Sequence, residues 1–255
     1  AHEADKMLLR RLLTGPIRGA FWRVGWDLLR VHPQVHSGAR RARLLQASGI
    51  DVVLDVGANI GQFAGELRKN GYRGRIVSFE PLEQAFRALS QAAARDGRWI
   101  AEHTAIGAEG GTALINVSKN LASSSFLEAT PMLVASAPTA AFVTTETVRT
   151  ARLEAMIQKY VSPSDKAFLK IDVQGFELVV LASAGRLLDR ICLLQIETAL
   201  QRTYRGQPCF REVLDFCETS GFSVVGVEPG FTDAATGKLL ELDLLLARDA
   251  ESTCR

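Results

Sequence analysis

The chain has 255 residues, of which 47% are hydrophobic and 23% are charged, and its formal net charge is +2. This composition is typical of a globular protein with a substantial core and excludes a low-complexity or disordered chain. No apolar run approaches the roughly 20 residues that cross a bilayer. Arginines interrupt the apolar clusters of residues 1–30, so we expect neither a signal peptide nor a membrane anchor.

Residues 1–48 carry an excess of positive charge. Nine basic side chains stand against three acidic ones, a balance of +6, so the remaining residues carry about −4 (6 − 4 = 2). We expect a helical extension here whose basic, partly amphipathic face contacts an acidic ligand or an anionic membrane surface, although a solvated helical face has the same pattern. Aromatic residues do not interleave with the basic ones as a nucleic-acid platform requires, so we expect no nucleic-acid partner.

From residue 50 onward, strand-like and helix-like segments alternate. The pattern predicts helices at 61–70, 82–95, 176–188 and 208–220, and strands at 51–56, 75–79, 98–102, 104–106, 112–117, 166–172, 191–197, 222–228 and 239–247. Such alternation favours a parallel sheet covered on both faces. The connection between the last two strands is too short for a helical crossover, so they should pair antiparallel.

The predicted fold class is therefore α/β, a Rossmann-like, seven-stranded and mostly parallel sheet that ends in an antiparallel hairpin. This domain is expected over residues 49–255, after the N-terminal helical extension over residues 1–48. Residues 117–147, which are rich in Ser, Thr and Ala, are expected to form a long excursion from the sheet.

A carboxylate and two glycines follow the first strand of this domain. The stretch Asp55-Val56-Gly57-Ala58-Asn59-Ile60-Gly61 departs from the GxGxxG pattern of dinucleotide sites. A carboxylate ahead of the first glycine opposes a pyrophosphate but suits a ligand with a positive centre, such as S-adenosylmethionine. Glu80, at the end of the next strand, is placed to accept hydrogen bonds from ribose hydroxyls, which fits NAD equally well. As a structural alternative, each acid would stabilise the start of the following helix.

Charged residues also end two later strands. In "LKIDVQGFE" (169–177), Lys170 and Asp172 lie two apart and point to one face, and Glu197 ends the neighbouring strand. Charges at adjacent strand ends are costly unless they are paired or used, which favours a functional site over a structural ion pair. No His, Asp or Glu cluster has the spacing of metal ligands, so we predict no metal.

The four cysteines, Cys192, Cys209, Cys217 and Cys254, form no CxxC pair and lack zinc-site spacing. We expect reduced, mostly buried thiols, as in a cytoplasmic protein. The expected location is cytoplasmic, with peripheral membrane contact through the basic N-terminal segment.

With these motifs in this order, the chain resembles the FkbM-type methyltransferases, a branch of the Rossmann-like S-adenosylmethionine enzymes. The resemblance covers roughly residues 45–248 and rests on "LDVGANIGQF", "SFEP", "HTAIGAEGG", "ASSSF", "LKIDVQGFE" and "LQIE". The family pattern more often has glutamate where Gln174 stands. The resemblance implies an S-adenosylmethionine site, with S-adenosylhomocysteine as product, formed by Asp55, Gly57, Ala58, Asn59 and Gly61 at the methionine end, Glu80 and Pro81 at the ribose, and His103, Ala105 and Ile106 at the adenine.

Members of this family are expected to methylate oxygen, commonly on sugars of glycolipids, glycans or macrolide-type natural products. The protein must then align an acceptor hydroxyl with the sulfonium methyl group and take up its proton. We expect Asp172 at the centre of this chemistry, supported by Glu197 and Lys170. Lys170 is an alternative proton acceptor if desolvation lowers its pKa, or it stabilises developing negative charge, and His103 is a fourth candidate.

The acceptor is expected to be a small molecule or a glycolipid. A cofactor crevice alone cannot select a large acceptor, so selection requires elements outside the sheet. We expect its pocket to be formed by residues 1–48 and 117–147, with Ser123, Ser124 and Ser125 from the excursion and Leu12, Phe21, Trp22 and Trp26 from the extension. Two rival functions stay open: a nicotinamide-dependent oxidoreductase on a similar sheet, and a non-catalytic adaptor that binds the cofactor.

Overall fold

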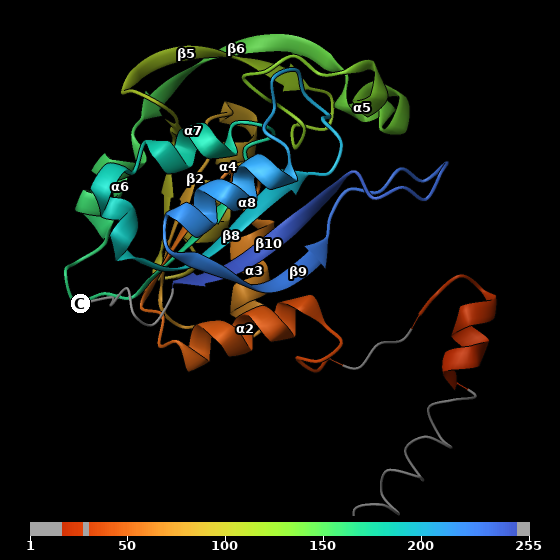
Figure 1. Ribbon diagram of the computed structural model, residues 1–255, viewed down its shortest axis with the longest axis horizontal. Coiled ribbons are helices and arrows are strands. Elements are labelled where there is room, and N and C mark those ends of the chain that lie inside the picture. The colour runs from red at the N-terminus through yellow and green to blue at the C-terminus, as the bar shows by residue number, and fades with distance from the viewer. Residues whose placement is uncertain (1–16, 28–30, 249–255) are drawn as a thin grey trace, which may run out of the picture. The chain divides into compact units, whose positions relative to one another are not determined.

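A seven-stranded sheet forms the centre of the larger of two units into which the chain divides, Ala1–Arg43 and Leu44–Arg255 (Figure 1). The computed structural model describes residues 17–27 and 31–248. The strands are β1 (Val52–Val56), β2 (Arg75–Phe79), β3 (Trp99–Glu102), β7 (Ala167–Ile171), β8 (Ile191–Ala199), β9 (Phe222–Pro229) and β10 (Glu241–Arg248).

The strand order is β3-β2-β1-β7-β8-β10-β9. The first five of these strands run parallel, and β10 pairs antiparallel with both β8 and β9. The predicted fold class, a mostly parallel α/β sheet with a terminal antiparallel hairpin, is thus confirmed. The order reverses between β1 and β7, and sheets of this kind bind ligands beyond the carboxyl ends of the strands at such a point.

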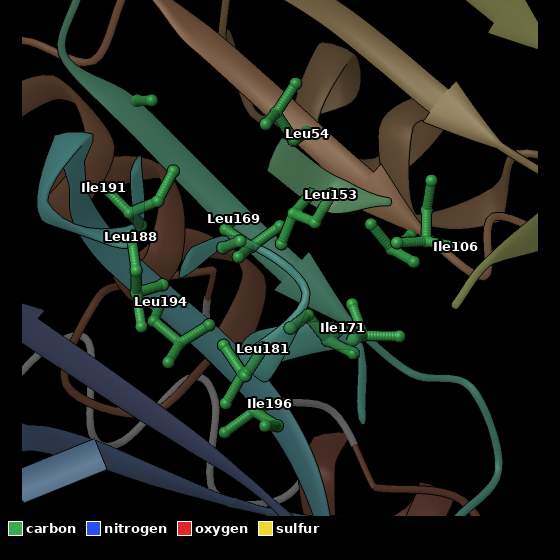
Figure 2. Close-up of a cluster of buried hydrophobic side chains, with 14 of the residues drawn as sticks. Leu54, Ile106, Leu153, Leu169, Ile171, Leu181, Leu188, Ile191, Leu194 and Ile196 are labelled. Atoms are coloured by element: carbon green, nitrogen blue, oxygen red, sulfur yellow. The ribbon is translucent and has the colours of Figure 1, made fainter. Parts of the chain in front are cut away.

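Helices cover both faces because every residue of β1 and β7 is buried, and all of them except Asp55 and Lys170 are apolar. On one face, α3 (Gln62–Lys69) and α4 (Glu83–Ala93) pack on Val53 and Phe168. On the other, α6 (Leu153–Tyr160), α7 (Glu177–Ala182) and α8 (Phe210–Thr219) enclose a cluster that includes Leu169 and Ile171 (Figure 2). The helix predicted at 176–188 is shorter, since α7 ends at Ala182, and a 3₁₀ helix (Gly185–Arg190) follows it, beginning at Gly185 with a left-handed φ of 53°.

A second, three-stranded sheet is built from β4 (Ala105–Ile106), β5 (Gly111–Ser118) and β6 (Phe142–Ala151), in the order β4-β6-β5. The expected excursion is therefore shorter than 117–147, since its two ends pair with each other and leave only residues 119–141 outside the strands. This segment contains α5 (Pro131–Ser136) and a 3₁₀ helix (Pro138–Ala140). Neither β6 nor α6 was predicted: β6 is polar and lacks apolar alternation, and α6 has only eight residues.

In the smaller unit, residues 17–23 are helical, and Arg18 forms an ion pair with Asp27 at 2.6 Å. Trp22 and Trp26 are each 70% exposed. The boundary between the units, at residues 43 and 44, falls within helix α2 (Ser37–Ala47), and the expected domain bounds at 48 and 49 stay a prediction. Among residues 17–27 and 31–248, no helix combines the length and apolarity that a bilayer crossing requires.

The cysteines do not all follow the expectation of reduced thiols. Cys209 and Cys217 are free, and burial raises the pKa of the Cys217 thiol to about 12. Cys192, by contrast, is disulfide-bonded, so the expectation is wrong at this position. The cysteine argument for a cytoplasmic location therefore no longer holds.

Candidate functional site

A cavity lies at the carboxyl ends of β1, β2 and β7, where the strand order reverses. It contains about 750 Å³ of empty space, its open mouth included. Its lining includes two carboxylates, and no lysine or arginine of the described residues lines it. The lining residues are Val56, Gly57, Asn59, Gln62, Phe79, Glu80, Pro81, Leu82, Thr104, Ala105, Ile106, Ile115, Leu121, Ala122, Ser124, Phe126, Asp172, Val173 and Gln174.

Backbone strain is concentrated around this cavity. Within the described residues, three that are not glycine adopt a left-handed conformation: Asn59 (φ 48°), Leu121 (φ 62°) and Gln174 (φ 56°). All three line the cavity, although they come from different segments of the chain. Such conformations persist only where the surroundings enforce them, and they gather at functional sites. The strained backbone positions and the reversal of strand order thus indicate the same cavity as the functional site.

The two glycines after β1 are required by contacts within the protein. Gly57 has a φ of 78°, and a Cβ placed on it would lie 1.8 Å from the carbonyl oxygen of Asp172. Gly61 has a φ of 87°, and its Cβ would lie 2.8 Å from the ring of Trp99. The space beside both glycines is filled by the polypeptide itself. Gly57 still lines the cavity through its backbone, and Gly61 does not.

We predict that Gly57→Ala destabilises the protein strongly. A left-handed φ costs a non-glycine residue about 1–2 kcal/mol, and overpacking against the Asp172 carbonyl adds about 1–3 kcal/mol. Gly65→Ala in α3 is the matched control, because nothing lies within 4 Å of its Cβ position. That change should stabilise the helix by about 0.5–1 kcal/mol. Urea unfolding of both variants measures the difference, and equal stabilities would contradict the close approach of β1 and β7.

Glu80 connects the loop after β1 to the start of α4. It is 5% exposed, and its two carboxylate oxygens accept hydrogen bonds from the backbone N–H groups of Asn59 (2.8 Å) and Leu82 (2.9 Å). Burial raises the pKa of Glu80 to about 7, although these two hydrogen bonds act in the opposite direction. The carboxylate lines the cavity, so its remaining lone pairs are available to hydroxyl donors of a ligand.

Asp55 and Lys170 form a buried ion pair beneath the cavity. Asp55, Ser78 and Lys170 are register partners on β1, β2 and β7. The Asp55 side chain is 0% exposed, accepts a hydrogen bond from Ser78 Oγ (2.9 Å) and lies 3.6 Å from Lys170 Nζ. Burial raises the pKa of Asp55, and the charge of Lys170 opposes this rise. Neither residue lines the cavity, and the contact of Asp55 with the methionine end of the cofactor stays a prediction.

The ammonium group of Lys170 is held by three acceptors. Its Nζ donates to the carbonyl of Gly57 (3.0 Å) and lies 3.3 Å from Asp172 Oδ2 as well as near Asp55. Burial alone would lower the pKa of Lys170, but the carboxylates of Asp172 and Asp55 outweigh it and the pKa is raised. The raised pKa of Lys170 argues against the alternative in which desolvation makes it a proton acceptor.

Asp172 and Glu197 are brought together by a residue that lies between them. Asp172 lines the cavity, and its side chain is 35% exposed. Gln174 Nε2 donates to Asp172 Oδ1 (2.9 Å) and to Glu197 Oε2 (2.8 Å). Glu197 does not line the cavity, and burial, followed by the charge of Asp172, raises its pKa. Of the two predicted carboxylates, Asp172 alone faces the cavity.

Sequence reasoning assigned no site role to Gln174, Glu177 or Tyr204. Glu177 Oε1 accepts hydrogen bonds from the backbone N–H groups of Val173 (3.2 Å) and Gly175 (3.0 Å), and burial raises its pKa to about 7. It thereby holds the loop that carries Asp172. Both Gln174 and Glu177 lie inside the motif of residues 169–177, so the sequence could have indicated that they belong to the site. Tyr204 lies in a loop after β8, and no local pattern marks it.

The remaining predicted residues divide into those at the cavity and those beside it. Pro81, Ala105, Ile106 and Ser124 line it, whereas Ala58 does not. His103 stacks on Phe86 with the ring centroids 4.4 Å apart and donates through Nε2 to the carbonyl of Pro81 (2.9 Å). His103 therefore stabilises the turn at Glu80 and Pro81 without lining the cavity.

Ser123 and Ser125 do not line the cavity, although Ser125 contacts Gln174, which does. Ser125 Oγ donates to the backbone carbonyl of Gln174 (2.7 Å), and the carbonyl of Ser123 accepts from Tyr204 (3.0 Å). Leu12 lies outside the described residues, and roles in acceptor binding for Phe21, Trp22 and Trp26 stay predictions. Across residues 17–27 and 31–248, no three His, Cys, Asp or Glu side chains are grouped as metal ligands would be.

Comparison with known proteins identifies one family. The profile described as "Methyltransferase FkbM domain" matches residues 55–224, which contain every residue that lines the cavity. A search of curated proteins finds no sequence match. The chain is similar to an FkbM methyltransferase structure from Methylobacillus flagellatus KT, with 16% identity over 77% of this chain and 43% of that one and a TM-score of 0.48. It is also similar to an rRNA methylase structure from Streptococcus thermophilus, with 12% identity over 87% and 99% of the two chains and a TM-score of 0.46.

Proposed function

Because the chain belongs to the FkbM methyltransferase family, we propose that it transfers the methyl group of S-adenosylmethionine to a hydroxyl oxygen on a sugar of a glycolipid, a glycan or a glycosylated natural product. The family match, over 170 residues (224 − 55 + 1), makes the chain a methyltransferase that uses S-adenosylmethionine and leaves the nicotinamide alternative without support. The observation that carries the choice of oxygen is the carboxylate of Asp172 in the cavity wall, since a hydroxyl must lose its proton.

The lining of the cavity fits S-adenosylmethionine better than a dinucleotide. Glu80 and Asp172 supply negative charge, and no basic side chain of the described residues lines the wall to meet a pyrophosphate. S-adenosylmethionine carries a sulfonium and an α-amino group and no phosphate. Glu80 would accept hydrogen bonds from the ribose hydroxyls, and the apolar wall near Ile106 and Phe126 would cover the adenine. Bound there, S-adenosylmethionine supplies an electrophilic methyl group.

The chain's own residues would orient the acceptor and take up its proton. Asp172 accepts the hydroxyl proton as the oxygen becomes nucleophilic. The ammonium of Lys170 lies 3.3 Å from Asp172 Oδ2 and contacts the carboxylate from the side of the sheet. Water at the open mouth can then remove the proton from Asp172, which is the exposed member of the carboxylate pair.

The acceptor would be selected by the segment that covers the cavity. Leu121, Ala122, Ser124 and Phe126, all from residues 119–141, line the wall that the main sheet does not provide. We extend the proposal to the basic N-terminal segment, whose exposed Trp22 and Trp26 suit the apolar face of a sugar or a lipid.

A transfer assay tests the proposed function. The purified chain is incubated with S-adenosylmethionine labelled in the methyl group and with glycolipids, free glycans and glycosylated macrolides in separate reactions. Label in an ether linkage to a sugar would support the proposal, whereas label in RNA or on nitrogen would contradict it. Cofactor binding in calorimetry without transfer to any acceptor would favour the non-catalytic adaptor.

The affinity for S-adenosylhomocysteine should depend on pH through Glu80. An ionised carboxylate accepts ribose hydrogen bonds, and Glu80 has a pKa of about 7, so binding should weaken as the pH falls from 8 to 6. One pH unit below the pKa leaves about one tenth of the groups ionised, which predicts an affinity loss of about tenfold. Calorimetry at both pH values measures this loss.

The variant Glu80→Gln should bind more weakly and lose the pH dependence. Glu83→Gln is the control, because Glu83 is exposed on α4 and does not line the cavity. If Glu80→Gln keeps the pH dependence of the wild-type chain, Glu80 does not hold the ribose.

A further inference from the structure

Leu121 is a bulky residue in a backbone conformation that bulky residues rarely adopt. Its φ is 62°, in the left-handed region, where the Cβ atom is crowded by the residue's own backbone. Its side chain is half-buried and lines the cavity. The fold therefore maintains an unfavourable conformation at a residue that faces the candidate site, and such strain gathers where ligands bind.

Hydrogen bonds on both sides of Leu121 hold it in this conformation. Its backbone N–H donates to the carbonyl of Ser118 (3.1 Å), and its own carbonyl accepts from the N–H of Ser124 (3.1 Å). The backbone N–H of Ser118 donates to Ser124 Oγ (3.0 Å), and Ser118 Oγ donates to Asn120 Oδ1 (2.8 Å). The segment over residues 118–124, called here the Leu121 turn, is thus closed by its own hydrogen bonds, which offset the strain.

The side chain of Leu121 packs at one end of the cavity. With Phe126 it lies against an apolar cluster from the start of α4 and the second sheet, whose buried members are Leu82, Ala85, Ala105, Ile115, Val117 and Val148. One of these, Ala105, lines the cavity. Another, Leu82, donates its backbone N–H to Glu80, the carboxylate proposed to hold the ribose. Leu121 therefore lies at the Glu80 end of the cavity.

The end of the same turn is linked to the loop that carries Asp172. Ser124 lines the cavity, and Ser125, the next residue, donates to the backbone carbonyl of Gln174 (2.7 Å). Gln174 lies two residues after Asp172, and both line the cavity. Within five residues, from 121 to 125, the chain thus passes from the Glu80 end of the cavity to the Asp172 end.

The chemistry of a nucleoside explains why an apolar side chain is held beside Glu80. The base attached to a ribose is a flat ring with two apolar faces, and ligand pockets cover such faces with apolar side chains. Leu121, Phe126 and Ile106 are apolar residues of the cavity wall. A leucine on a preformed turn also loses little conformational freedom when a ligand binds, which favours affinity.

We propose that Leu121 binds the cofactor: its side chain covers the adenine ring of S-adenosylmethionine, and the strained turn holds it in place before the cofactor binds. This inference rests on the proposed function. It divides the segment that covers the cavity between the two substrates, because Leu121 contacts the cofactor and Ser124, at the other end of the turn, contacts the acceptor.

Calorimetry with S-adenosylhomocysteine and with adenosine tests this assignment. The main variant is Leu121→Asn, because asparagine tolerates the left-handed conformation and lacks the apolar side chain. The affinities for both ligands should fall by a similar factor, about 5–30-fold, since both contain the adenine ring. The KM for the acceptor at saturating S-adenosylmethionine should not change. The matched control is Leu114→Asn on β5, because Leu114 is 61% exposed and does not line the cavity.

A second pair of variants separates the backbone strain from the contact with the ligand. Leu121→Gly and Leu121→Ala both lack the leucine side chain, but glycine adopts a φ of 62° without the steric crowding that alanine meets. Both should lose affinity for adenosine, whereas Leu121→Gly should unfold at a higher urea concentration than Leu121→Ala. A lower urea midpoint for Leu121→Gly would contradict a strained turn and overturn this part of the inference.

Unchanged affinity for adenosine in Leu121→Asn overturns the inference. Wild-type cofactor affinity together with a raised acceptor KM also overturns it and assigns Leu121 to the acceptor. If Leu121→Asn does not fold, Leu121→Gly decides by the same two criteria. A wild-type chain that binds neither S-adenosylhomocysteine nor adenosine overturns this inference and the proposed function together. Binding of both ligands by a wild-type chain that methylates no acceptor contradicts the proposed transfer alone, and the Leu121 variants then decide the inference by calorimetry.

Discussion

Replacing Asp172 by asparagine is expected to lower the turnover of methyl transfer about 10²–10⁴-fold, the usual contribution of a positioned general base. The amide side chain of the Asp172→Asn variant would keep the shape of the carboxylate but could not accept the hydroxyl proton. Cofactor affinity should change far less, because Glu80 and the backbone after β1, which also line the cavity, are left unchanged by the substitution. Initial rates with saturating S-adenosylmethionine and calorimetry of S-adenosylhomocysteine measure the two effects separately.

The control for this prediction is Asp215→Asn on the exposed side of α8, which should have wild-type rates. Equal losses of turnover and cofactor affinity in Asp172→Asn would recast Asp172 as a cofactor ligand. Full activity would transfer the role of the base to Glu197, the other carboxylate that Gln174 contacts.

Lys170→Met is expected to lower the free energy of unfolding by about 3–5 kcal/mol, the usual cost of leaving one partner of a buried ion pair uncompensated. The partner left behind is the carboxylate of Asp55, which is 0% exposed. Burial already raises the pKa of Asp55, and loss of the ammonium should raise it further. The folded state then binds a proton more readily than the unfolded state, whose Asp has a pKa of about 3.9.

The sign of the pH dependence follows from this difference. The loss of stability should be largest at alkaline pH, where Asp55 must be ionised while buried, and should diminish as the pH falls through its raised pKa. Urea unfolding at pH 8 and pH 5 measures this. Lys166→Met serves as the control because Lys166 is exposed, and the double variant Asp55→Asn/Lys170→Met should recover much of the loss. A loss below about 1 kcal/mol at pH 8, the range of exposed pairs, would refute a buried ion pair.

The sequence by itself was sufficient to predict the main sheet and the edge of that sheet at which the cavity lies. Apolar runs such as residues 51–56 and 166–172 alternate with amphipathic helices, and that periodicity is a local property which needs no knowledge of distant contacts. Because parallel strands end at one edge of a sheet, Glu80 after β2 and Asp172 after β7 lie at the same edge, and both line the cavity. By contrast, β6 was missed because it is polar, and its pairing with β5 is what makes it a strand.

Only the tertiary structure decided which side chains face the cavity and which support it. Asp55 and Glu80 both lie near the carboxyl end of a strand. Asp55 is still inside β1, and its side chain lies beside Lys170 and not in the cavity wall. Glu80 follows the last residue of β2, and its side chain lines the cavity. The partners of Gln174 lie 23 and 30 residues further along the chain, at Glu197 and Tyr204. Contacts of this kind are determined by strand register and by the packing of loops from different elements, which no local pattern encodes. The charged motif over residues 169–177 could therefore be predicted from the sequence, whereas the hydrogen bonds of Gln174 to Asp172 and Glu197 became evident only in the folded chain.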